Sequence, residues 1–298
     1  MHARFKTIAL IGRFADPLVA DAMLALAGYA TARGVEVLVD AEGPANLATG
    51  ASRLPEAELA GRAELVVAVG GDGTLLYAAK LAEGSNVPLL GINRGRLGFL
   101  ADISASEMLE RFGDVLDGRY SRDVRHGLSA RLVEGGRTGR SGHALNDVVV
   151  TKQETGRMLD FETWIDGHFV NAHGGDGLVI ASATGSTAYA LSCGGPILTP
   201  NLEALVLAPI SPHTLSDRPI VVSRRSVVEV HLVAKAPVRA QVSCDGIVLG
   251  DLPLNGKLVV EPAATSVTLL HPPGYDYFRI LRSKLHWGRG ARHAHPEG

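Results

Sequence analysis

The chain has 298 residues, of which 46% are hydrophobic and 20% are charged, and its formal net charge is −2. This length and composition suffice for the cores of two globular domains, so we expect no extensive disorder. Aromatic residues make up only 5%, and the sequence has no basic stripe, which excludes a typical nucleic-acid-binding protein. No run approaches the roughly 18 consecutive apolar residues of a membrane span, so we expect neither nucleic acid nor a membrane as a partner.

The cysteines and the first apolar run indicate the cellular compartment in which the protein is expected. Cys193 and Cys244 lack the spacing of metal ligands, and we expect two free thiols in a reducing environment. Residues 8–11 form an apolar run that is too short for the core of a signal peptide. We therefore expect a cytoplasmic protein, and we predict no metal site built from its own side chains.

The first hundred residues alternate between predicted strands and helices. Apolar runs predict strands at residues 7–12, 35–39, 65–69 and 87–92. Residues 17–33 have the apolar spacing of a helix, which Gly34 would end. This alternation predicts a parallel sheet with helices on its faces, and ligands of such sheets bind at the carboxyl ends of the strands.

Residues 70–74, with the sequence Gly-Gly-Asp-Gly-Thr, follow the third predicted strand and precede a predicted helix at 74–81, for which Thr74 would be the N-cap. Glycines allow the backbone to approach a ligand closely, and the free N–H groups of a helix start attract phosphate. Asp72 would stand where a metal ion or a hydroxyl group meets that phosphate. The structural alternative is a tight turn in which Asp72 bonds its own backbone.

A second glycine-rich stretch, residues 91–100, follows the last of these strands and contains Arg94 and Arg96. Arginines at the same sheet edge as Asp72 could neutralise phosphate charge, or the stretch could be a solvated loop. A helix is predicted next, at residues 104–116.

From residue 122 to about residue 270 the pattern changes to short strands. Residues 159–165 alternate, so Leu159 and Phe161 would share one face with Thr163, and Asp166-Gly167 then predicts a hairpin turn. Further strands are predicted at residues 227–233, 238–242, 257–260 and 267–270. We expect an all-β, sandwich-like domain.

The change of pattern divides the chain. We expect an α/β domain at residues 1–110 and a β-rich domain at residues 111–274. Residues 275–298 begin with helical spacing, and we expect them to pack back on the first domain.

Two polar blocks of the β-rich domain could contact a nucleotide. Asn146 and Asp147 precede a strand at residues 148–150, where Asp147 could accept hydrogen bonds from two ribose hydroxyls; a plain turn is the alternative. Residues 184–189, Thr-Gly-Ser-Thr-Ala-Tyr, follow a short apolar strand. They offer hydroxyls for polar contacts and Tyr189 for stacking on a ring, or else a helix start with Tyr189 in the core.

In order and spacing, these blocks strongly resemble the NAD kinase family, and the resemblance covers nearly the whole chain. It extends to residues 211–215, to Cys244-Asp245-Gly246 and to residues 281–285. The Gly-Gly-Asp-Gly turn alone is shared with phosphofructokinases and lipid kinases, whereas residues 184–189 together with Asn146-Asp147 are far more specific. The resemblance implies the NAD kinase/diacylglycerol kinase-like superfold, with an α/β N-terminal domain that binds the phosphate donor and a β-sandwich that binds NAD.

The resemblance also implies an activity. NAD kinases transfer a phosphoryl group to the 2′-hydroxyl of the adenosine ribose of NAD, giving NADP. By this resemblance Asp72 would be the general base, which typically contributes about 10²–10⁴-fold in rate. Mg²⁺ is expected with the phosphates, and both ATP and inorganic polyphosphate stay open as donors.

The family's site residues map onto this sequence by motif. The residues implied for NAD binding are Asp72, Gly73, Asn146, Asp147, Arg157, Gly174, Asp176, Thr184, Thr187, Ala188, Tyr189, Ser192 and Gly246. The residues implied for the phosphate donor are Gly70, Gly71, Gly73, Thr74, Asn93 and Arg94. Asp176 would lie near a subunit interface, which implies a homodimer or homotetramer.

Three departures from the family pattern affect the expected site. Asp147 replaces the more usual Glu, Ala183 replaces the usual Pro, and Gly174 stands where some members carry a larger or basic residue. The small Gly174 would leave room beside the nicotinamide, so we expect tolerance of NADH as well as NAD. The alternatives are a related sugar or lipid kinase and a non-catalytic dinucleotide sensor.

Overall fold

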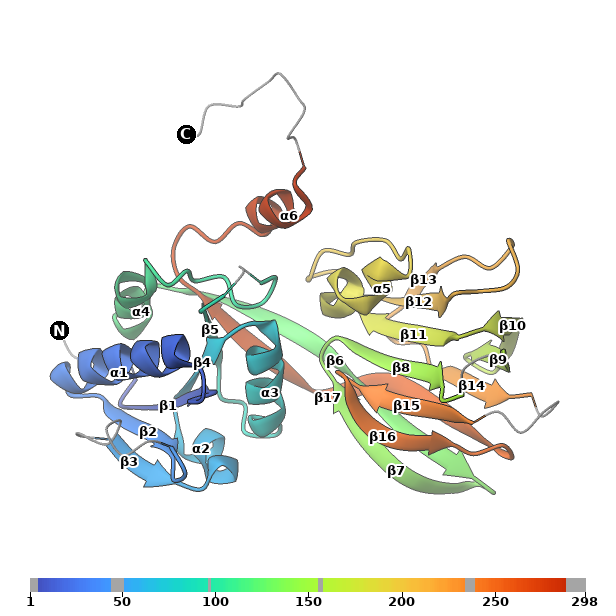
Figure 1. Ribbon diagram of the computed structural model, residues 1–298, viewed down its shortest axis with the longest axis horizontal. Helices are drawn as coiled ribbons and strands as arrows, with labels where there is room; N and C mark the ends of the chain where they lie inside the picture. Colours follow the sequence, from blue (N-terminus) through green and yellow to red (C-terminus); the bar gives the residue numbers. More distant parts are fainter. Residues whose placement is uncertain (1–4, 44–50, 96–97, 155–157, 234–238, 288–298) are drawn as a thin grey trace. The chain divides into compact units, whose positions relative to one another are not determined.

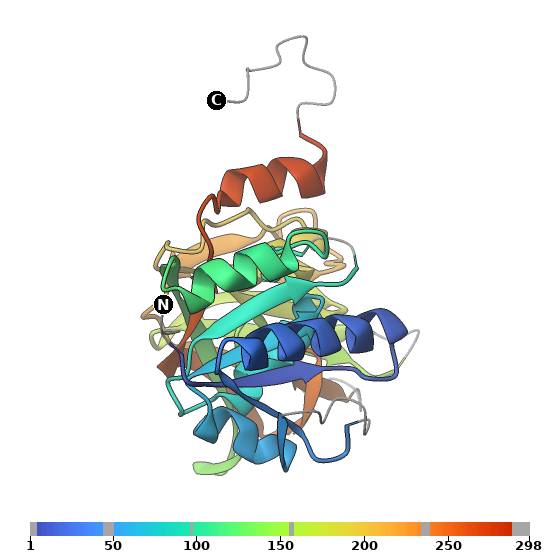
Figure 2. The same cartoon turned by 90° about the vertical axis from the view of Figure 1, so that its left-hand side faces the viewer.

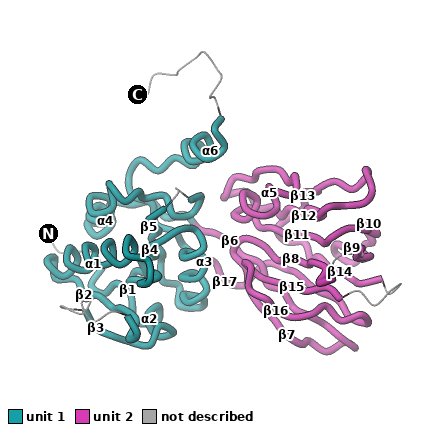
Figure 3. Tube along the Cα trace, viewed as in Figure 1, with its two compact units in different colours: residues 1–123, 268–298 teal, residues 124–267 magenta. Residues whose placement is uncertain are grey.

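The computed structural model describes residues 5–43, 51–95, 98–154, 158–233 and 239–287 (Figure 1). The chain forms two compact units (Figure 3). The first unit comprises Met1–Asp123 and Thr268–Gly298, and the second comprises Val124–Val267. Strands β6 (Ser121–Glu134) and β17 (Gly256–His271) each have residues in both units.

The first unit contains a parallel sheet, as the sequence predicts. Its strand order is β3-β2-β1-β4-β5, and Leu269 of β17 pairs with Leu89 of β5 in parallel. The strands are β1 (Thr7–Gly12), β2 (Glu36–Asp40), β3 (Ala51–Leu54), β4 (Leu65–Gly70) and β5 (Leu89–Asn93). Every residue of β4 and β5 is buried, because helices cover both faces of a parallel sheet and its central strands are therefore uninterrupted apolar runs.

Helices α1 (Pro17–Ala32), α2 (Glu56–Arg62), α3 (Asp72–Leu81) and α4 (Met108–Leu116) lie around the sheet of the first unit (Figure 1). Helix α6 (Tyr277–Leu285) follows β17 in the same unit. Helix α1 starts where Asp16 accepts a hydrogen bond from Leu18 N (3.0 Å) and Pro17 occupies the first turn, and Gly34 follows its end with a φ of +75°. Helices α1 and α4 lie side by side on one face and share a core with alternate strand residues (Figures 1 and 2).

The first unit extends past the expected boundary at residue 110. Phe112, Val115 and Leu116 of α4 are fully buried in its core, and removal of such an aromatic side chain costs about 3–5 kcal/mol. The unit also takes the chain back at residue 268, because the end of β17 pairs with β5. In helix α6, Lys284 Nζ lies 5.7 Å from the ring centroid of Phe99 in the same unit.

The second unit is an antiparallel β-sandwich, which confirms the predicted fold class. One sheet has the order β13-β12-β11-β8-β15-β16, and β10-β9-β14-β17 form the other with the β6–β7 hairpin. The remaining strands are β7 (Arg137–Ala144), β8 (Asp147–Lys152), β9 (Leu159–Ile165), β10 (His168–Gly175), β11 (Gly177–Ser182), β12 (Ala204–Ile210), β13 (Ile220–Ser223), β14 (Val228–Leu232), β15 (Ala240–Cys244) and β16 (Ile247–Leu252). The strands predicted at 257–260 and 267–270 are parts of the single long strand β17.

Burial explains why residues 148–150 of β8 are all apolar while β9 alternates. Val148 and Val150 lie in the sandwich core together with Leu159 and Phe161. Val149 faces the opposite way, into a smaller core that contains Ala190 and Leu198. Strand β8 is thus buried on both faces. Among the described residues, no helix is long and apolar enough to cross a membrane.

Candidate active site

The Gly-Gly-Asp-Gly-Thr segment connects β4 to α3. The helix begins at Asp72 with Gly71 as its N-cap, so the expectation that Thr74 is the N-cap is wrong. Instead, the Thr74 side chain lies against the backbone of Gly70, where a Cβ would be 2.3 Å from Thr74 Oγ1. Gly71 and Gly73 are exposed, and a Cβ at either would meet no atom within 4 Å. No side chain at Gly71 or Gly73 therefore blocks the approach of a ligand to this helix start, where an anion can bind.

The Asp72 carboxylate is fixed by the loop that follows β5. Its Oδ2 accepts a hydrogen bond from Phe99 N (2.8 Å), and its Oδ1 accepts bonds from Leu100 N (3.1 Å) and Ala101 N (3.0 Å). An ionised carboxylate has about four acceptor positions, so one remains at Oδ2. The oriented carboxylate can still accept a hydrogen bond or a proton there.

Asn93 and Arg94 organise the same loop. Asn93 is buried; its Oδ1 accepts a hydrogen bond from Gly95 N (2.8 Å), and its Nδ2 donates one to Ala101 O (3.3 Å). Arg94 N donates to Gly70 O (3.0 Å), and Arg94 Nε donates to Leu18 O (3.0 Å). The sheet edge thus brings Asn93 and Arg94 to the Asp72 turn, whereas Arg96 lies outside the described residues.

In the second unit, Asn146 and Asp147 open strand β8 beside the turn between β15 and β16. Asp245 in that turn accepts hydrogen bonds from Leu145 N, Asn146 N and Asp147 N at 2.7, 2.8 and 3.1 Å. Asn146 Oδ1 is buried and has no hydrogen-bond partner among the described residues. Gly246 completes the turn with a φ of +78°, a conformation that glycine adopts without cost.

The Thr-Gly-Ser-Thr-Ala-Tyr block lies against Asn146. Ser182 Oγ donates to Leu145 O (2.6 Å), and Ser182 N donates to Asn146 O (2.8 Å). Gly185 lies so close that a Cβ there would be 2.1 Å from Asn146 O. The structure therefore brings together two blocks that are separated by more than thirty residues in the sequence.

The block folds as a 3₁₀ turn, η2 (Thr184–Thr187), and one short helix, α5 (Tyr189–Ser192). Its hydroxyls mostly bond the protein itself. Thr187 Oγ1 donates to Thr184 O (3.3 Å), and the fully buried Ser186 donates to Ala183 O (2.7 Å) and accepts from Leu198 N (2.9 Å). Ala188 is half-buried, and Tyr189 is 42% exposed, so its ring is a surface feature and not part of the core.

Asp147 carries the most perturbed titration in this region. It is 6% exposed. Burial, followed by the nearby Asp245 carboxylate, raises its pKa to about 7, and a backbone hydrogen bond from Tyr189 opposes the rise. Burial also raises the pKa of Tyr189 and of Cys193. Near neutral pH, Asp147 therefore passes between an acceptor-only carboxylate and a neutral acid.

The remaining expected residues lie around β10, β11 and α5. Asp176 forms an ion pair with Lys152 (2.5 Å), whose hydrogen bond lowers the Asp176 pKa. Gly174 faces Met158, where a Cβ would be 2.9 Å from the thioether sulfur. Ser192 is exposed at the end of α5, and Arg157 lies outside the described residues.

Two polar residues were missed by the sequence reasoning. Arg125 is buried to 1% exposure, and its Nη1 donates to Thr184 Oγ1 (3.3 Å). Ser182 stands between the two blocks, as described above. Nothing in the sequence around Arg125 indicates burial, because it is a lone arginine in a polar strand. Ser182 could have been predicted as a site residue, because it ends an apolar strand immediately before the Thr-Gly-Ser-Thr block.

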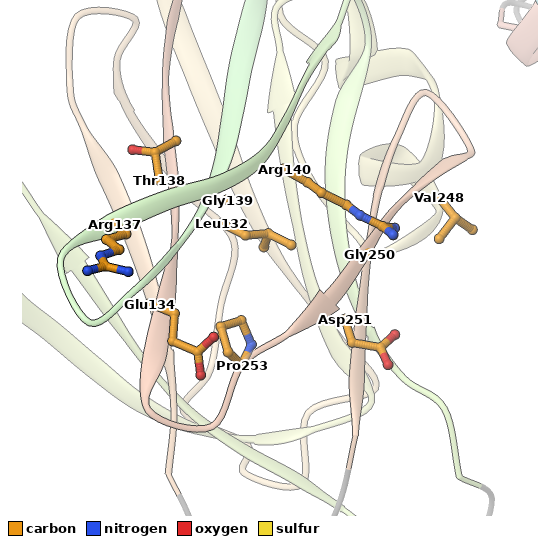
Figure 4. A pocket seen from close by; sticks show the side chains of 10 residues that line it. All are labelled: Leu132, Glu134, Arg137, Thr138, Gly139, Arg140, Val248, Gly250, Asp251 and Pro253. Carbon is orange, nitrogen blue, oxygen red and sulfur yellow. The ribbon is translucent and has the colours of Figure 1, made fainter.

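A pocket of about 630 Å³ lies elsewhere in the second unit, between β7 and β16 (Figure 4). Charged side chains of both signs line it, with Arg137 and Glu134 on the β6–β7 hairpin, Arg140 on β7 and Asp251 on β16. None of the expected site residues lines it. Within the described residues, no group of three or more His, Cys, Asp or Glu side chains is arranged to hold a metal ion.

A parallel α/β unit with a carboxylate at a glycine-rich helix start, together with a β-sandwich, defines a class of two-domain kinases. Residues 9–120 match the model of the ATP-NAD kinase N-terminal domain, and residues 145–271 match that of the C-terminal domain. The chain belongs to the NAD kinase family.

Individual relatives agree over almost the full length. The NAD kinase of Methylococcus capsulatus is 46% identical over 290 residues, which cover 96% of this chain and 99% of the relative. That of Aromatoleum aromaticum is 41% identical over 295 residues, which cover 98% of this chain and 97% of the relative.

Two solved structures share the fold. Yeast NADH kinase complexed with NADH superposes with a TM-score of 0.86 and 25% identity, covering 97% of this chain and 90% of the other. An NAD kinase from Archaeoglobus fulgidus in complex with ATP superposes with a TM-score of 0.73 and 26% identity, covering 94% of this chain and 98% of the other. These relatives do not favour a sugar kinase, a lipid kinase or a non-catalytic sensor.

Proposed function

We propose that this chain phosphorylates the 2′-hydroxyl of the adenosine ribose of NAD, using ATP, and releases NADP and ADP. The observation that carries the proposal is the Asp72 carboxylate, held by three backbone N–H groups at the start of α3 with one acceptor position left. Relatives named NAD kinase and a related structure with bound ATP support the same reaction.

In this reaction Asp72 is the general base. Its free Oδ2 position accepts the proton of the 2′-hydroxyl while that oxygen bonds the γ-phosphorus and the bond to the β-phosphate oxygen breaks. The open glycines at Gly71 and Gly73 let the phosphates approach the helix start, where the N–H groups offset their charge. Gly70, Thr74, Asn93 and Arg94 hold the shape of this phosphate-binding edge through the contacts described above.

The second unit would hold the dinucleotide. Asp147 accepts hydrogen bonds from ribose hydroxyls, Asn146 offers its buried amide oxygen, and the exposed Tyr189 ring provides a face for stacking. Thr184, Thr187, Ala188, Ser192, Gly246 and Arg157 complete the proposed NAD-binding set.

Mg²⁺ accompanies the phosphate donor as part of that substrate. Both Asp72 oxygens already accept backbone hydrogen bonds, and no group of three candidate ligands occurs among the described residues. The ion would therefore be held mainly by phosphate oxygens and water, as is usual for Mg²⁺ in kinases. Inorganic polyphosphate remains a second candidate donor.

The proposal also covers self-association of the chain and the use of NADH as a substrate. Asp176, paired with Lys152 at the start of β11, would lie near the interface of a homodimer or homotetramer in the cytoplasm, where the enzyme supplies NADP. Gly174 adds no bulk beside Met158, and a related kinase binds NADH. We therefore propose that NADH is accepted as well.

The test is NADP formation by the purified chain with NAD, ATP and Mg²⁺, followed with an NADP-specific dehydrogenase. We expect turnover that requires Mg²⁺, and a loss of about 10²–10⁴-fold in kcat for Asp72→Asn, because the amide cannot take the proton. Calorimetry should show NAD binding retained in that variant. An unchanged kcat would remove Asp72 from the reaction, and absent turnover in the unmodified chain would overturn the proposed activity.

A further inference from the structure

We propose that Asp245 is the positioning residue of the NAD-binding edge, and that it holds Asn146 and Asp147 in their working orientation through their backbone. This inference rests on the function proposed above, in which Asp147 accepts hydrogen bonds from NAD. It assigns Asp245 no contact with the substrate.

The turn between β15 and β16 directs the Asp245 side chain to this place. Cys244 pairs with Ile247, so Asp245 and Gly246 form a two-residue hairpin turn with φ angles of +47° and +78°. Positive values at both positions are those of a type I′ turn, which favours Asp-Gly. On the other side, Cys244 pairs with Val148 of β8, which places Asp245 next to Asp147.

The contacts are many and reciprocal. Asp245 Oδ1 accepts from both Asn146 N and Asp147 N, and Oδ2 accepts from Leu145 N. Asp245 N donates in return to Asp147 O (3.0 Å). Hydrogen bonds to a charged acceptor are about twice as strong as neutral ones, so three of them at one carboxylate fix the start of β8 firmly.

Ser182 fixes the carbonyl side of the same segment, through Leu145 O and Asn146 O. The backbone at residues 145–147 is thus bonded on its N–H side by Asp245 and on its carbonyl side mainly by Ser182. The side chains of Asn146 and Asp147 project from this fixed backbone and can meet a ligand. Asp245 therefore determines where those two side chains point.

Asp245 also acts on the charge of Asp147. The groups that face Asp147 are Asp245 from the β15–β16 turn and Tyr189 and Cys193 from α5 and its C-cap. Of these, Asp245 is the one whose carboxylate raises the Asp147 pKa, second only to burial. Removing the charge of Asp245 while keeping its size should therefore lower the pH at which Asp147 becomes a full acceptor.

The test compares Asp245→Asn and Asp245→Glu with the unmodified enzyme. For Asp245→Asn, whose amide cannot accept the Leu145 N–H bond, we expect the KM for NAD to rise about tenfold, with a smaller change in kcat and in the KM for ATP. Because the Asp147 pKa is about 7, we expect kcat/KM for NAD to rise with pH through that value in the unmodified enzyme. In Asp245→Asn this acid limb should move to lower pH. Asp245→Glu keeps the charge, so it should raise KM and leave the limb in place.

The chain contains a matched control. Asp166-Gly167 forms the same kind of turn between β9 and β10, with φ angles of +51° and +79°, and Asp166 Oδ1 accepts from Val227 N (2.8 Å). Asp166→Asn alters the same turn chemistry at a position that does not face Asp147. It should leave both the KM for NAD and the pH profile unchanged.

The outcomes separate the two proposals. If the unmodified enzyme forms no NADP, the proposed function fails. If it is active but Asp245→Asn keeps the KM and the acid limb of the parent, the positioning role of Asp245 is wrong. Should Asp245→Asn not fold, Asp245→Glu with an unchanged KM for NAD would overturn the inference, and so would Asp147→Asn if it retained the acid limb.

Discussion

Gly98 lies directly against the carboxylate of Asp72, so closely that a Cβ at residue 98 would be 1.7 Å from Asp72 Oδ1. The next three residues of the loop donate their N–H groups to the same carboxylate. The loop can approach this closely only because residue 98 has no side chain. The orientation of the proposed general base thus depends on a glycine that is 26 residues away in the sequence.

Gly98→Ala should therefore impair the proposed reaction. The added methyl group displaces either the loop or Asp72, and a misplacement of about 1 Å can cost on the order of 100-fold in rate. We expect a fall of that size in kcat for NADP formation, with the fold preserved in circular dichroism spectra. Gly95→Ala in the same loop is the control, because a Cβ there meets no atom of the described residues within 4 Å. Equal activity of the two variants would contradict this account.

The raised pKa of Asp147 predicts a pH dependence of stability without ligand. The pKa moves from 3.8 to about 7 on folding, so the folded state holds the proton more tightly. The resulting stabilisation is fully present below pH 3.8 and is lost as the pH rises through about 7. It amounts to on the order of 4 kcal/mol.

Asp147→Asn removes this titration. Relative to the unmodified chain, the variant should gain free energy of unfolding as the pH rises from 4 to about 7, and the difference should stay constant above that. Urea unfolding followed by fluorescence at several pH values measures it. A difference that does not vary with pH would show that Asp147 has an ordinary pKa.

Gly185→Ala should disturb the NAD-binding edge. A Cβ at residue 185 would be 2.1 Å from Asn146 O, and overpacking of this kind costs about 1–3 kcal/mol. We expect a lower thermal midpoint and a raised KM for NAD, with little change in the KM for ATP. In Gly139→Ala the nearest atom would be Leu132 O at 3.5 Å, an ordinary contact, so both quantities should stay at their original values.

Gly174 predicts a modest preference between the two redox forms of the substrate. The atoms nearest to a Cβ at residue 174 would be those of the Met158 thioether and Asp160, and glycine itself adds no bulk where the nicotinamide is proposed to lie. The ratio of kcat/KM for NAD over NADH should stay below about a hundredfold, which corresponds to roughly 2.7 kcal/mol. Parallel assays with both dinucleotides measure the ratio, and a larger value would refute the idea.

Much of the fold was predictable because burial leaves a clear pattern. The uninterrupted apolar runs of β4 and β5 and the alternation in β9 correspond to strands that are covered on two faces and on one face. Strand β3 and helix α2 were not predicted. Strand β3, Ala-Ser-Arg-Leu, is only partly buried, and the buried residues of helix α2 are the adjacent pair Leu59 and Ala60, so neither element shows a clear period.

The residues of the site were easier to predict than their partners. Asp72, Asn146 and Asp147 stand at strand ends, where side chains of a parallel or antiparallel sheet meet ligands. The donors that hold Asp72 are backbone N–H groups of a distant loop, which any residue possesses and no motif marks. Asn146 and Asp147 instead donate their own backbone N–H groups to the distant Asp245 carboxylate. The N-cap of α3 was mispredicted because Thr74 has the right chemistry, whereas the actual N-cap is Gly71, three residues earlier.

The return of β17 to the first sheet affects the order in which the two units can complete their folding during synthesis. All the strands assigned wholly to the sandwich precede residue 268, whereas Leu269 must still pair with Leu89 to complete the first sheet. On the ribosome, the later-starting sandwich therefore has its whole sequence available before the unit that begins the chain. A fragment ending at Asp123 would lack one strand of its sheet, so separate expression of the first unit requires residues 268–287 to be joined to it.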